Sequence, residues 1–374
     1  MLRLALVCSA LCLIGPSEDG PDRESTGGAR GVQEPGAVES FGISPDEEAA
    51  RRSLERGLAY LAERQKSEPD GSLPGGGREF APTAVTALSA LAWMAGGSTP
   101  ERGPHGRPLG KAVDYLLAKT QFDVNGENPG YVSAGGDNLS RMHGHGFATT
   151  ALAQAFAISQ RTPRGKKIEH GLRIAVRCIE ESQHTDGGWG YHPRVSLSHE
   201  GSVTITVVQA LRAAHNSGLK VDVQVIAKAV DYVARSQKDD GSFKYSLSDE
   251  RSTVSLTAAA IATLNATGDY SSKKIRSGYD YLFRKLEARK STGLEESSVP
   301  RCEFYERLYL AQSFWQHPEE SVFQNWVAEE RERVLKSQNE DGSWTGAQYG
   351  DCYATAMNCL FLALPEGLLP IFQR

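Results

Sequence analysis

Two histidines separated by one residue stand in the most unusual polar segment of the chain, Arg141-Met142-His143-Gly144-His145-Gly146. An imidazole titrates near neutral pH, so His143 and His145 are candidates for general acid–base catalysis. A His-x-His pair also has the donor atoms for a metal ion, with Cys302 and Cys352 as further candidate ligands. No complete metal or cofactor motif accompanies them, and the sequence predicts no cofactor.

Other polar residues recur at intervals, each just ahead of a segment rich in small apolar residues. Among the acidic ones, Glu200, Asp249 and Glu250 are candidate acid or base partners for the two histidines. Helix N-termini attract anions, which favours a binding site, but the same residues also suit ordinary helix capping, and both interpretations stay open. The candidate ligand-binding residues are Arg141, His143, His145, His199, Arg251, Arg301 and Asp351.

Helices in alternating pairs are expected to position these residues. The first helix of a pair is amphipathic, as in 46–66, where Leu54, Leu58 and Leu61 recur at helical spacing. Its partner, 82–95, is rich in Ala, Thr and Leu, whose small members let neighbouring helices approach closely. No stretch alternates for long enough to predict a long strand. The other expected pairs are 109–119 with 146–159, 167–182 with 202–216, 223–236 with 253–265, 274–289 with 303–316, and 321–337 with 353–364.

A short phrase ends the first helix of several pairs, most cleanly as Gln237-Lys238-Asp239-Asp240-Gly241-Ser242-Phe243. Its Asp-Gly pair predicts a turn in which the aspartate bonds nearby backbone and the glycine adopts a positive φ. We expect the glutamine to reach backbone groups of the next helix start and the aromatic residue to cover the turn. The structural residues of the three clearest phrases are Gln183, Asp186, Gly187 and Trp189; Gln237, Asp240, Gly241 and Phe243; and Gln338, Asp341, Gly342 and Trp344.

The turns also set a period. Measured at Asp70, Asn125, Asp186, Asp240, Gly293 and Asp341, successive turns are 55, 61, 54, 53 and 48 residues apart. This period suits two helices and their loops, and it predicts a solenoid or a closed ring of six helix pairs. A column of threonines near the start of each second helix is interpreted as packing. Its members are Thr86, Thr150, Thr206, Thr257 and Thr355, with Glu306 in the fifth unit.

The segment 228–237, continuing to Gly241 and Phe243, resembles the QW repeat of squalene and oxidosqualene cyclases. It has a basic residue, a small one, an aromatic and an aliphatic ahead of the Gln…Gly…aromatic ending, and 56–65 matches the front half. Resemblance to terpenoid cyclases and protein prenyltransferase β subunits implies an all-α fold, the α-α toroid or (α/α)6 barrel, with parallel inner helices inside a ring of outer ones. It also implies an apolar or isoprenoid-like ligand in the central cavity.

The catalytic motifs of that superfamily are incomplete in this chain. Squalene-type cyclases protonate an alkene with an Asp-x-Asp-Asp motif, which the chain lacks; its adjacent aspartates, Asp239 and Asp240, belong to a turn phrase. It also lacks the Asp-Asp-x-x-Asp motif for magnesium-bound diphosphate. The prenyltransferase zinc site of Asp, Cys and His has counterparts in Asp351 and Cys352, but Ala354 stands where the histidine is expected.

Composition and the N-terminal segment limit the class of protein. The 374 residues are 40% hydrophobic and 23% charged with net charge −5, so no basic excess predicts nucleic-acid binding. Residues 1–16 resemble an export signal, in which Arg3 precedes an apolar run too short to span a bilayer. Residues 17–45 are predicted as a disordered linker and 46–374 as the toroid. We therefore expect an exported protein, periplasmic or secreted, with no transmembrane span in the mature chain.

Three functions fit these observations. The first is a protein that binds an apolar or isoprenoid-like molecule in its cavity. The second is an enzyme, a lyase or transferase, with its active site around His143 and His145. The third is a non-catalytic scaffold for protein partners. A dry, aromatic cavity lining favours the first function, and a polar, acidic lining favours the second.

Removal of residues 1 to about 45 is expected to leave the stability of the toroid unchanged, because this segment has too little apolar surface to offset the entropy of ordering it. The measurement is the thermal midpoint of the full chain and of a chain that starts near Pro45. A large drop in the midpoint of the shorter chain would contradict the prediction.

Overall fold

A computed structural model describes residues 44–74, 76–135, 137–195, 199–292 and 303–370. The expected signal and linker lie outside these ranges, except for residues 44 and 45. Arg301 and Cys302 also lie outside them. Within the ranges the chain is mostly helical, with one short hairpin and one 3-10 turn. Among the described helices, none combines the length and apolar character needed to cross a bilayer.

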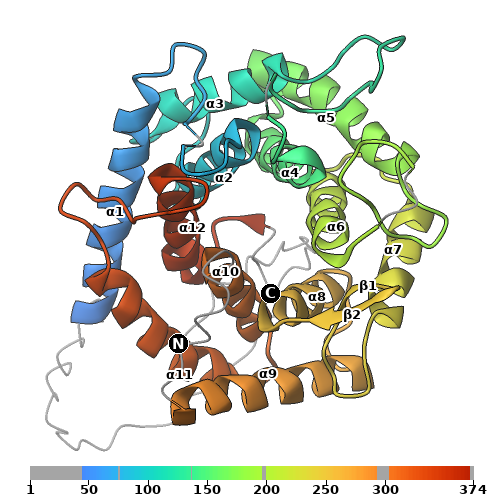
Figure 1. Cartoon of the computed structure of the whole chain (residues 1–374). Helices are drawn as coiled ribbons and strands as arrows, with labels where there is room; N and C mark the ends of the chain where they lie inside the picture. The colour runs from blue at the N-terminus through green and yellow to red at the C-terminus, as the bar shows by residue number, and fades with distance from the viewer. Residues whose placement is uncertain (1–43, 75, 136, 196–198, 293–302, 371–374) are drawn as a thin grey trace, which may run out of the picture. The chain divides into compact units, whose positions relative to one another are not determined.

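The described helices form two concentric rings, as Figure 1 shows. Inner and outer helices alternate along the sequence, which confirms the predicted α-α toroid. The outer helices are α1 (Pro45–Gln65), α3 (Gly106–Ala118), α5 (Pro163–Glu181), α7 (Val223–Arg235), α9 (Lys273–Thr292) and α11 (Glu320–Lys336). The inner helices are α2 (Pro82–Ala95), α4 (Arg141–Ser159), α6 (Gly201–Asn216), α8 (Val254–Ala266), α10 (Glu303–Trp315) and α12 (Asp351–Ala363). The hairpin β1 (Lys244–Ser246) and β2 (Asp249–Ser252) precedes α8, and η1 (Leu364–Glu366) follows α12.

The sequences of the two helix classes explain their places. In α1, Leu54, Leu58 and Leu61 are buried on one face, and a capping box between Ser44 and Glu47 starts the helix. In α2, every residue except Ala84 is buried, because this helix has neighbours on all sides. Its Ala, Ser and Thr side chains are small enough for that close packing.

Each clear turn phrase clamps its unit to the outer helix of the next unit. The Nε2 of Gln237 donates to the Gly241 carbonyl inside the turn (3.1 Å) and to the Lys274 carbonyl in the first turn of α9 (2.8 Å). Gly241 has a φ of 91°, and a Cβ there would lie 2.1 Å from the carbonyl oxygen of Ser277. The paired glutamine bonds recur in three other units, at Gln65, Gln183 and Gln338. The expected roles of the glutamine and the glycine are thus confirmed.

The aromatic residue after the turn joins the turn to the inner helix. Trp189 and Trp344 are 1% and 2% exposed, and each indole N–H donates to a carbonyl near the end of the preceding outer helix. The backbone N–H of Trp344 donates to Thr355 Oγ1 (3.0 Å). Thr86 and Thr257 accept the equivalent bond in their units. These threonines therefore pack the turn against the inner helix, as predicted.

Two members of the expected threonine column are displaced. In unit three the backbone N–H of Trp189 donates to Thr204 Oγ1 (3.1 Å) and not to Thr206. Two residues correspond to about 200° around a helix, so Thr206 faces another direction and bonds back to its own helix. In unit two, Thr150 also bonds within its helix, and His145 accepts the backbone N–H of Val132 in place of a threonine.

Unit six closes the ring onto unit one with the same clamp. Gln338 Nε2 donates to the Ser53 carbonyl of α1 at 2.9 Å. A Cβ on Gly342 would lie 2.6 Å from the Arg56 carbonyl oxygen, and the Arg56 guanidinium donates to the carbonyl of Asn339 (2.6 Å). Chain segments some 280 residues apart are thereby joined by the interaction that elsewhere joins neighbouring units.

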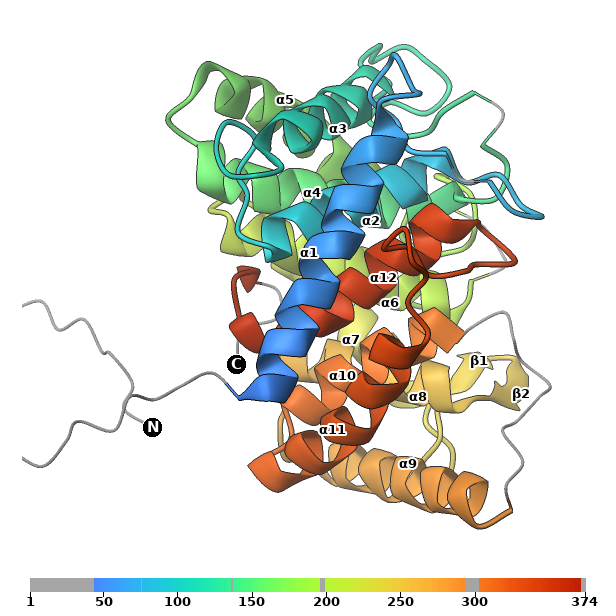
Figure 2. The same cartoon turned by 90° about the vertical axis from the view of Figure 1, so that its left-hand side faces the viewer.

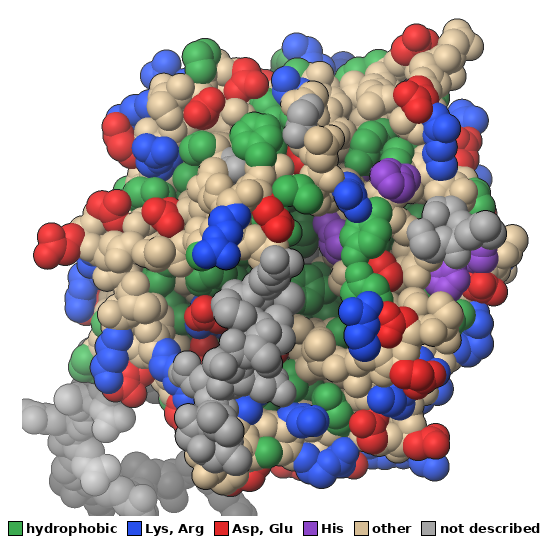
Figure 3. Space-filling model, viewed as in Figure 1, with side chains coloured by type: hydrophobic (Ala, Val, Ile, Leu, Met, Phe, Trp, Pro, Cys, Tyr) green, Lys and Arg blue, Asp and Glu red, His purple; other side chains and the backbone are tan. Residues whose placement is uncertain are grey.

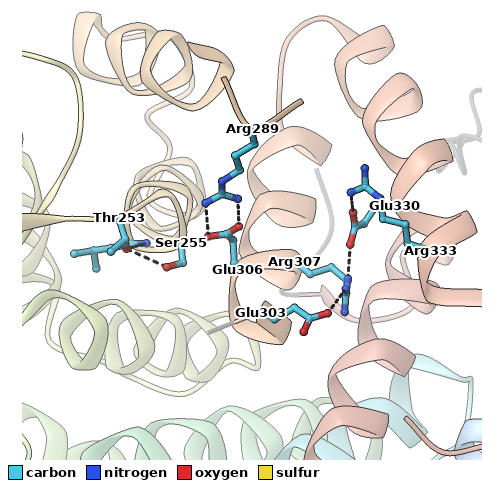
Figure 4. A network of polar contacts seen from close by, with 9 residues as sticks. Thr253, Ser255, Arg289, Glu303, Glu306, Arg307, Glu330 and Arg333 are labelled. Atoms are coloured by element: carbon cyan, nitrogen blue, oxygen red, sulfur yellow. Dashed lines mark hydrogen bonds and ion pairs between the residues drawn. The ribbon is translucent and has the colours of Figure 1, made fainter. Parts of the chain in front are cut away.

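Ion pairs hold the fifth unit, whose turn landmark Gly293 lies outside the described residues. Figure 4 shows Arg289 of α9 on Glu306 of α10, and Arg307 of α10 on Glu330 of α11. Arg307 and Glu330 are 10% and 11% exposed and 2.6 Å apart. Arg307 also donates to Asn358 of α12 (2.8 Å). These polar contacts therefore join α10 to α9 in its own unit and to both helices of unit six, α11 and α12.

Two predicted boundaries in unit two were wrong. Helix α4 begins at Arg141, five residues before the expected Gly146, so the histidine segment is its first turns and not a loop ahead of it. Gly144 and Gly146 fit there because Ser140 and Thr206 leave no room for a side chain, with a Cβ 2.2 and 2.8 Å from them. The turn of this unit was predicted at Asn125, but the glycine with the positive φ that makes the turn is Gly130 (84°).

Gly241→Ala is expected to destabilise the protein more than Gly218→Ala, although both glycines have a φ of 91°. Gly218 has no atom within 4 Å of its Cβ position, so its replacement costs only the left-handed backbone, about 1–2 kcal/mol. At Gly241 the added Cβ also meets a backbone carbonyl, which adds about 1–3 kcal/mol. Chemical denaturation of the two variants measures the difference. Equal losses of stability in the two variants would show that the close approach of Gly241 to the Ser277 carbonyl does not matter.

Candidate functional site

The starts of the inner helices meet at one face of the ring. In Figure 2, the β1–β2 hairpin, which precedes α8, and the loop before α12 both lie at the right-hand side, which is the face toward the viewer in Figure 1. Figure 3 views this face and shows a hollow near its centre, with hydrophobic side chains inside it and charged side chains and a histidine at its rim. We call this face the mouth.

A chain of hydrogen bonds at the mouth joins α4 to α6. His143 Nε2 lies 2.9 Å from Ser202 Oγ, and that hydroxyl lies 2.7 and 2.8 Å from the two carboxylate oxygens of Glu200. His143 and Glu200 are 3.6 Å apart. With Ser202 donating to the carboxylate, its oxygen accepts the Nε2–H of a neutral His143. Two predicted residues, His143 and Glu200, are therefore brought together by a serine that the sequence did not single out.

The start of α6 fixes the carboxylate of this chain. Glu200 is the N-cap of α6 and accepts the backbone N–H groups of Ser202 and Val203 (3.1 and 2.9 Å). Its own backbone N–H bonds to the Trp189 carbonyl, and the residue is 3% exposed. Helix capping and the site interaction are thus made by the same side chain, and the two interpretations of this position are compatible.

His143 is the accessible member of the chain, with 23% of its side chain exposed. Burial lowers its pKa, the Glu200 carboxylate partly opposes that shift, and the nearby Arg141 adds to it. Within the described residues, Nδ1 has no hydrogen-bond partner. A neutral His143 therefore holds its Nε2 proton on Ser202 and leaves an acceptor for a ligand.

Arg141 and two tyrosines flank this histidine. Arg141 is the one non-glycine residue with positive φ (47°) in the described ranges, and its guanidinium lies 5.2 Å from the centre of the Tyr191 ring. Tyr191 packs on His143 (5.8 Å) and makes a short hydrogen bond to Tyr245. Strained backbone persists only where surrounding contacts hold it, and it concentrates at functional sites.

Hydrogen bonds between α6 and α10 cross the inside of the ring about halfway along these helices. Tyr309 OH donates to Gln209 Oε1 (3.0 Å), and Gln209 Nε2 donates to Gln312 Oε1 (3.0 Å). Helix α8 separates α6 and α10 in the inner ring (Figure 1), so these side chains span the space enclosed by it. They form a polar floor beneath the mouth.

His145 has a structural role, which corrects its assignment to the mouth. It is fully buried; Nδ1 accepts the Val132 backbone N–H (3.1 Å), and Nε2 lies 3.2 Å from the Ala175 carbonyl oxygen. Both ring nitrogens are thus occupied by backbone, which fixes the neutral tautomer. Burial lowers the pKa of His145 to about 4, with an opposing effect of the Ala175 bond. Neither catalysis nor metal binding is available to this side chain in the folded protein.

The remaining candidates are dispersed. On the hairpin, Asp249 pairs with Arg251 and Glu250 with Lys244, and Glu250 and Arg251 are exposed. Asp351 accepts the backbone N–H of Gly346 at the start of α12. The structure therefore does not gather these three acidic residues around His143.

Two other predicted residues lie away from His143. His199 bonds Tyr232 of α7 (2.9 Å) and so faces the outer ring. Cys352 is buried, which raises its thiol pKa to about 11 and opposes metal ligation by the thiolate. Cys302, the other cysteine named as a candidate metal ligand, and Arg301 lie outside the described residues.

His145→Thr is expected to remove one acid-dependent loss of stability. Because the folded-state pKa of His145 is near 4 and an unfolded histidine titrates near 6.5, the unfolded chain binds the extra proton in this interval. The neutral form of His145 therefore contributes about 3 kcal/mol to the free energy of unfolding above pH 6.5. This contribution is lost as the pH falls toward 4, because the unfolded chain takes up the proton first. Urea unfolding at pH 7 and pH 5 compares the two proteins; an equal loss in both would contradict the assignment.

The fold agrees with that of solved structures, while no family profile and no curated protein matches the sequence. A variant of the type II terpene cyclase MstE from Scytonema, bound to its substrate geranylgeranyl dihydroxybenzoate, has a TM-score of 0.56 and 14% identity over 86% of this chain and 99% of that one. The α-1,6-mannanase GH76A from Salegentibacter sp. has a TM-score of 0.58 and 11% identity, with 86% and 99% covered. At these identities the likeness shows the fold alone: this chain is an α-α toroid, as terpene cyclases and GH76 mannanases are.

Proposed function

We propose that this toroid binds an apolar, isoprenoid-like small molecule in the hollow of the inner ring, with the polar end of the molecule at His143. The observation that carries the proposal is the composition of the hollow. Figure 3 shows hydrophobic side chains inside it. The His143–Ser202–Glu200 chain supplies hydrogen-bonding groups at the starts of α4 and α6, on the face where the hollow opens. Ligand sites of this kind combine a mostly apolar wall with a few fixed polar groups.

Aromatic side chains at the starts of inner helices and in the segments that precede them support this choice of ligand. Tyr191, Tyr245, Phe304 and Tyr353 are partly buried and pack against the core. Phe304 of α10 contacts Tyr353 of α12 edge to face at 5.9 Å. Such rings offer large apolar area to a hydrocarbon chain at low entropic cost. A similar toroid, MstE, has been seen with geranylgeranyl dihydroxybenzoate, a substrate with one apolar and one polar end.

The second candidate is an enzyme that uses the same histidine as an acid or base. The hydrogen-bond chain from His143 through Ser202 to Glu200 favours it, because a carboxylate can stabilise a proton taken up along such a chain. A cyclase reaction is not supported, since protonation of an alkene needs a far stronger acid than a histidine. Mannan hydrolysis needs two free carboxylates across a glycosidic bond, and Glu200 is engaged in capping α6.

Export and a scaffold role remain proposals of the sequence. Export rests on residues 1–16, which the structure does not describe. A scaffold that only presents loops would need no hollow lined by hydrophobic side chains, and we rank it below the other two.

Binding is tested by titrating the purified protein with geranylgeraniol, squalene and α-1,6-mannotetraose. Geranylgeraniol is expected to bind at one molecule per chain, and His143→Ala should weaken it about tenfold through the lost hydrogen bond. Squalene has no polar end, so its binding should not change in that variant. Failure of both isoprenoids to bind, or binding of the saccharide alone, would overturn the proposal.

The matched control is His170→Ala on α5, which removes an exposed histidine stacked on Phe122 outside the inner ring. It should leave the binding of both isoprenoids unchanged. Product analysis by mass spectrometry after incubation separates the two candidates: turnover that is lost in both His143→Ala and Ser202→Ala would support the enzyme.

A further inference from the structure

The turn of unit three differs from the turns of three other units at one position. In the others the aspartate accepts both the backbone N–H and the hydroxyl of a serine two residues on. These pairs are Asp70 with Ser72, Asp240 with Ser242, and Asp341 with Ser343. In unit three the aspartate is Asp186 and the serine is replaced by Gly188, where a Cβ would lie 2.7 Å from the Tyr232 ring. The Asp186 carboxylate therefore lacks the serine that holds its counterparts.

Two histidines take the place of that serine. Asp186 Oδ2 lies 3.3 Å from His184 Nδ1 and 3.3 Å from His199 Nε2. Tetrahedral zinc with bonds of about 2.0–2.1 Å has its ligand atoms roughly 3.3–3.4 Å apart. In the part of the chain that the structure describes, these three residues form the one group of histidine, cysteine and acidic side chains spaced to hold a metal ion.

The surroundings prepare the histidines for ligation. Tyr232 OH lies 2.9 Å from His199 Nδ1, so it orients the ring and leaves Nε2 toward Asp186. The His184 and His199 side chains are 14% and 9% exposed, whereas Asp186 is 49% exposed. The site is thus anchored on its histidine side and open to water on its aspartate side, as a zinc site with an exchangeable fourth ligand is.

Two groups oppose ligation. His184 Nδ1 accepts the Asp186 backbone N–H at 3.1 Å, so a metal ion on this nitrogen replaces that hydrogen bond. The Arg235 guanidinium donates to the Asp186 carbonyl (2.7 Å) and brings a positive charge near the site, although it also pairs with Asp231. Zinc binding in proteins contributes far more free energy than one hydrogen bond does.

We propose that His184, Asp186 and His199 bind one zinc ion at the turn of unit three, with a water molecule or an external ligand in the fourth position. The site lies outside the His143–Ser202–Glu200 chain, and it does not depend on the ligand proposed for the central hollow. Its donor set, two imidazoles and one carboxylate, is one that open zinc sites use.

The experiment is isothermal titration of the chelator-treated full chain with zinc chloride, together with thermal unfolding. We expect one zinc ion per chain and a raised midpoint of unfolding, because a ligand that binds the folded state stabilises it. Asp186→Asn keeps the shape of the turn and should lower the zinc affinity at least about 100-fold. Tyr232→Phe removes only the orienting hydroxyl and should lower it roughly tenfold.

Asp240→Asn is the matched control, since it alters the equivalent aspartate of unit four, which bonds a serine. It should leave zinc affinity unchanged while it weakens its own turn. The proposal is overturned if the wild-type chain shows no saturable binding, or if Asp186→Asn binds zinc as the wild type does. Equal losses in the Asp186 and Asp240 variants, with circular dichroism confirming that both are folded, would also overturn it.

Discussion

The glutamine clamp between successive units is the interaction on which the ring depends. One amide group bonds a carbonyl of its own turn and a carbonyl of the next outer helix, so a single side chain fixes both the turn and its neighbour. A net hydrogen bond contributes only about 1 kcal/mol. The clamp gains from repetition, because the same bonds join unit six to unit one and the ring has no end unit at that junction. An open solenoid must cap such ends with polar surface.

Much of this frame was predictable from sequence, because the clamp needs specific residues at fixed spacing. The glutamine is needed to bond two carbonyls, the glycine to adopt a positive φ, and the aromatic residue to fill the buried space at the turn. The helix pairs follow from the periodicity of the apolar residues. The threonine that accepts the backbone N–H of the turn was harder to identify. Thr204 and Thr206 lie on the same helix, and only the position of Trp189 distinguishes them. The start of α4 was misplaced because glycines normally disfavour helix, whereas here close neighbours require them.

The candidate site was only partly predictable, for two physical reasons. His143 and Ser202 are 59 residues apart and meet because α4 and α6 are neighbours in the inner ring, which no local pattern reveals. His145 has the chemistry of a catalytic residue but the environment of a packing residue, and burial decides between these roles. The repeat itself holds a signal that sequence reasoning left unused: where a unit departs from the phrase, as at Gly188, a group that is elsewhere engaged becomes available.

The segment before α6 contributes one residue to the mouth and one to the turn of unit three. Glu200 is extended, with φ −150° and ψ 157°, and neighbouring side chains of an extended backbone point to opposite sides. Glu200 accordingly turns inward to cap α6 and reach Ser202, while His199 turns outward to Tyr232 and Asp186. One peptide thus carries both the carboxylate of the mouth and a histidine of the unit-three turn. The position of the His199 backbone and the position of Glu200 are therefore set by the same peptide, which is held at Glu200 by its bonds to Trp189, Ser202 and Val203.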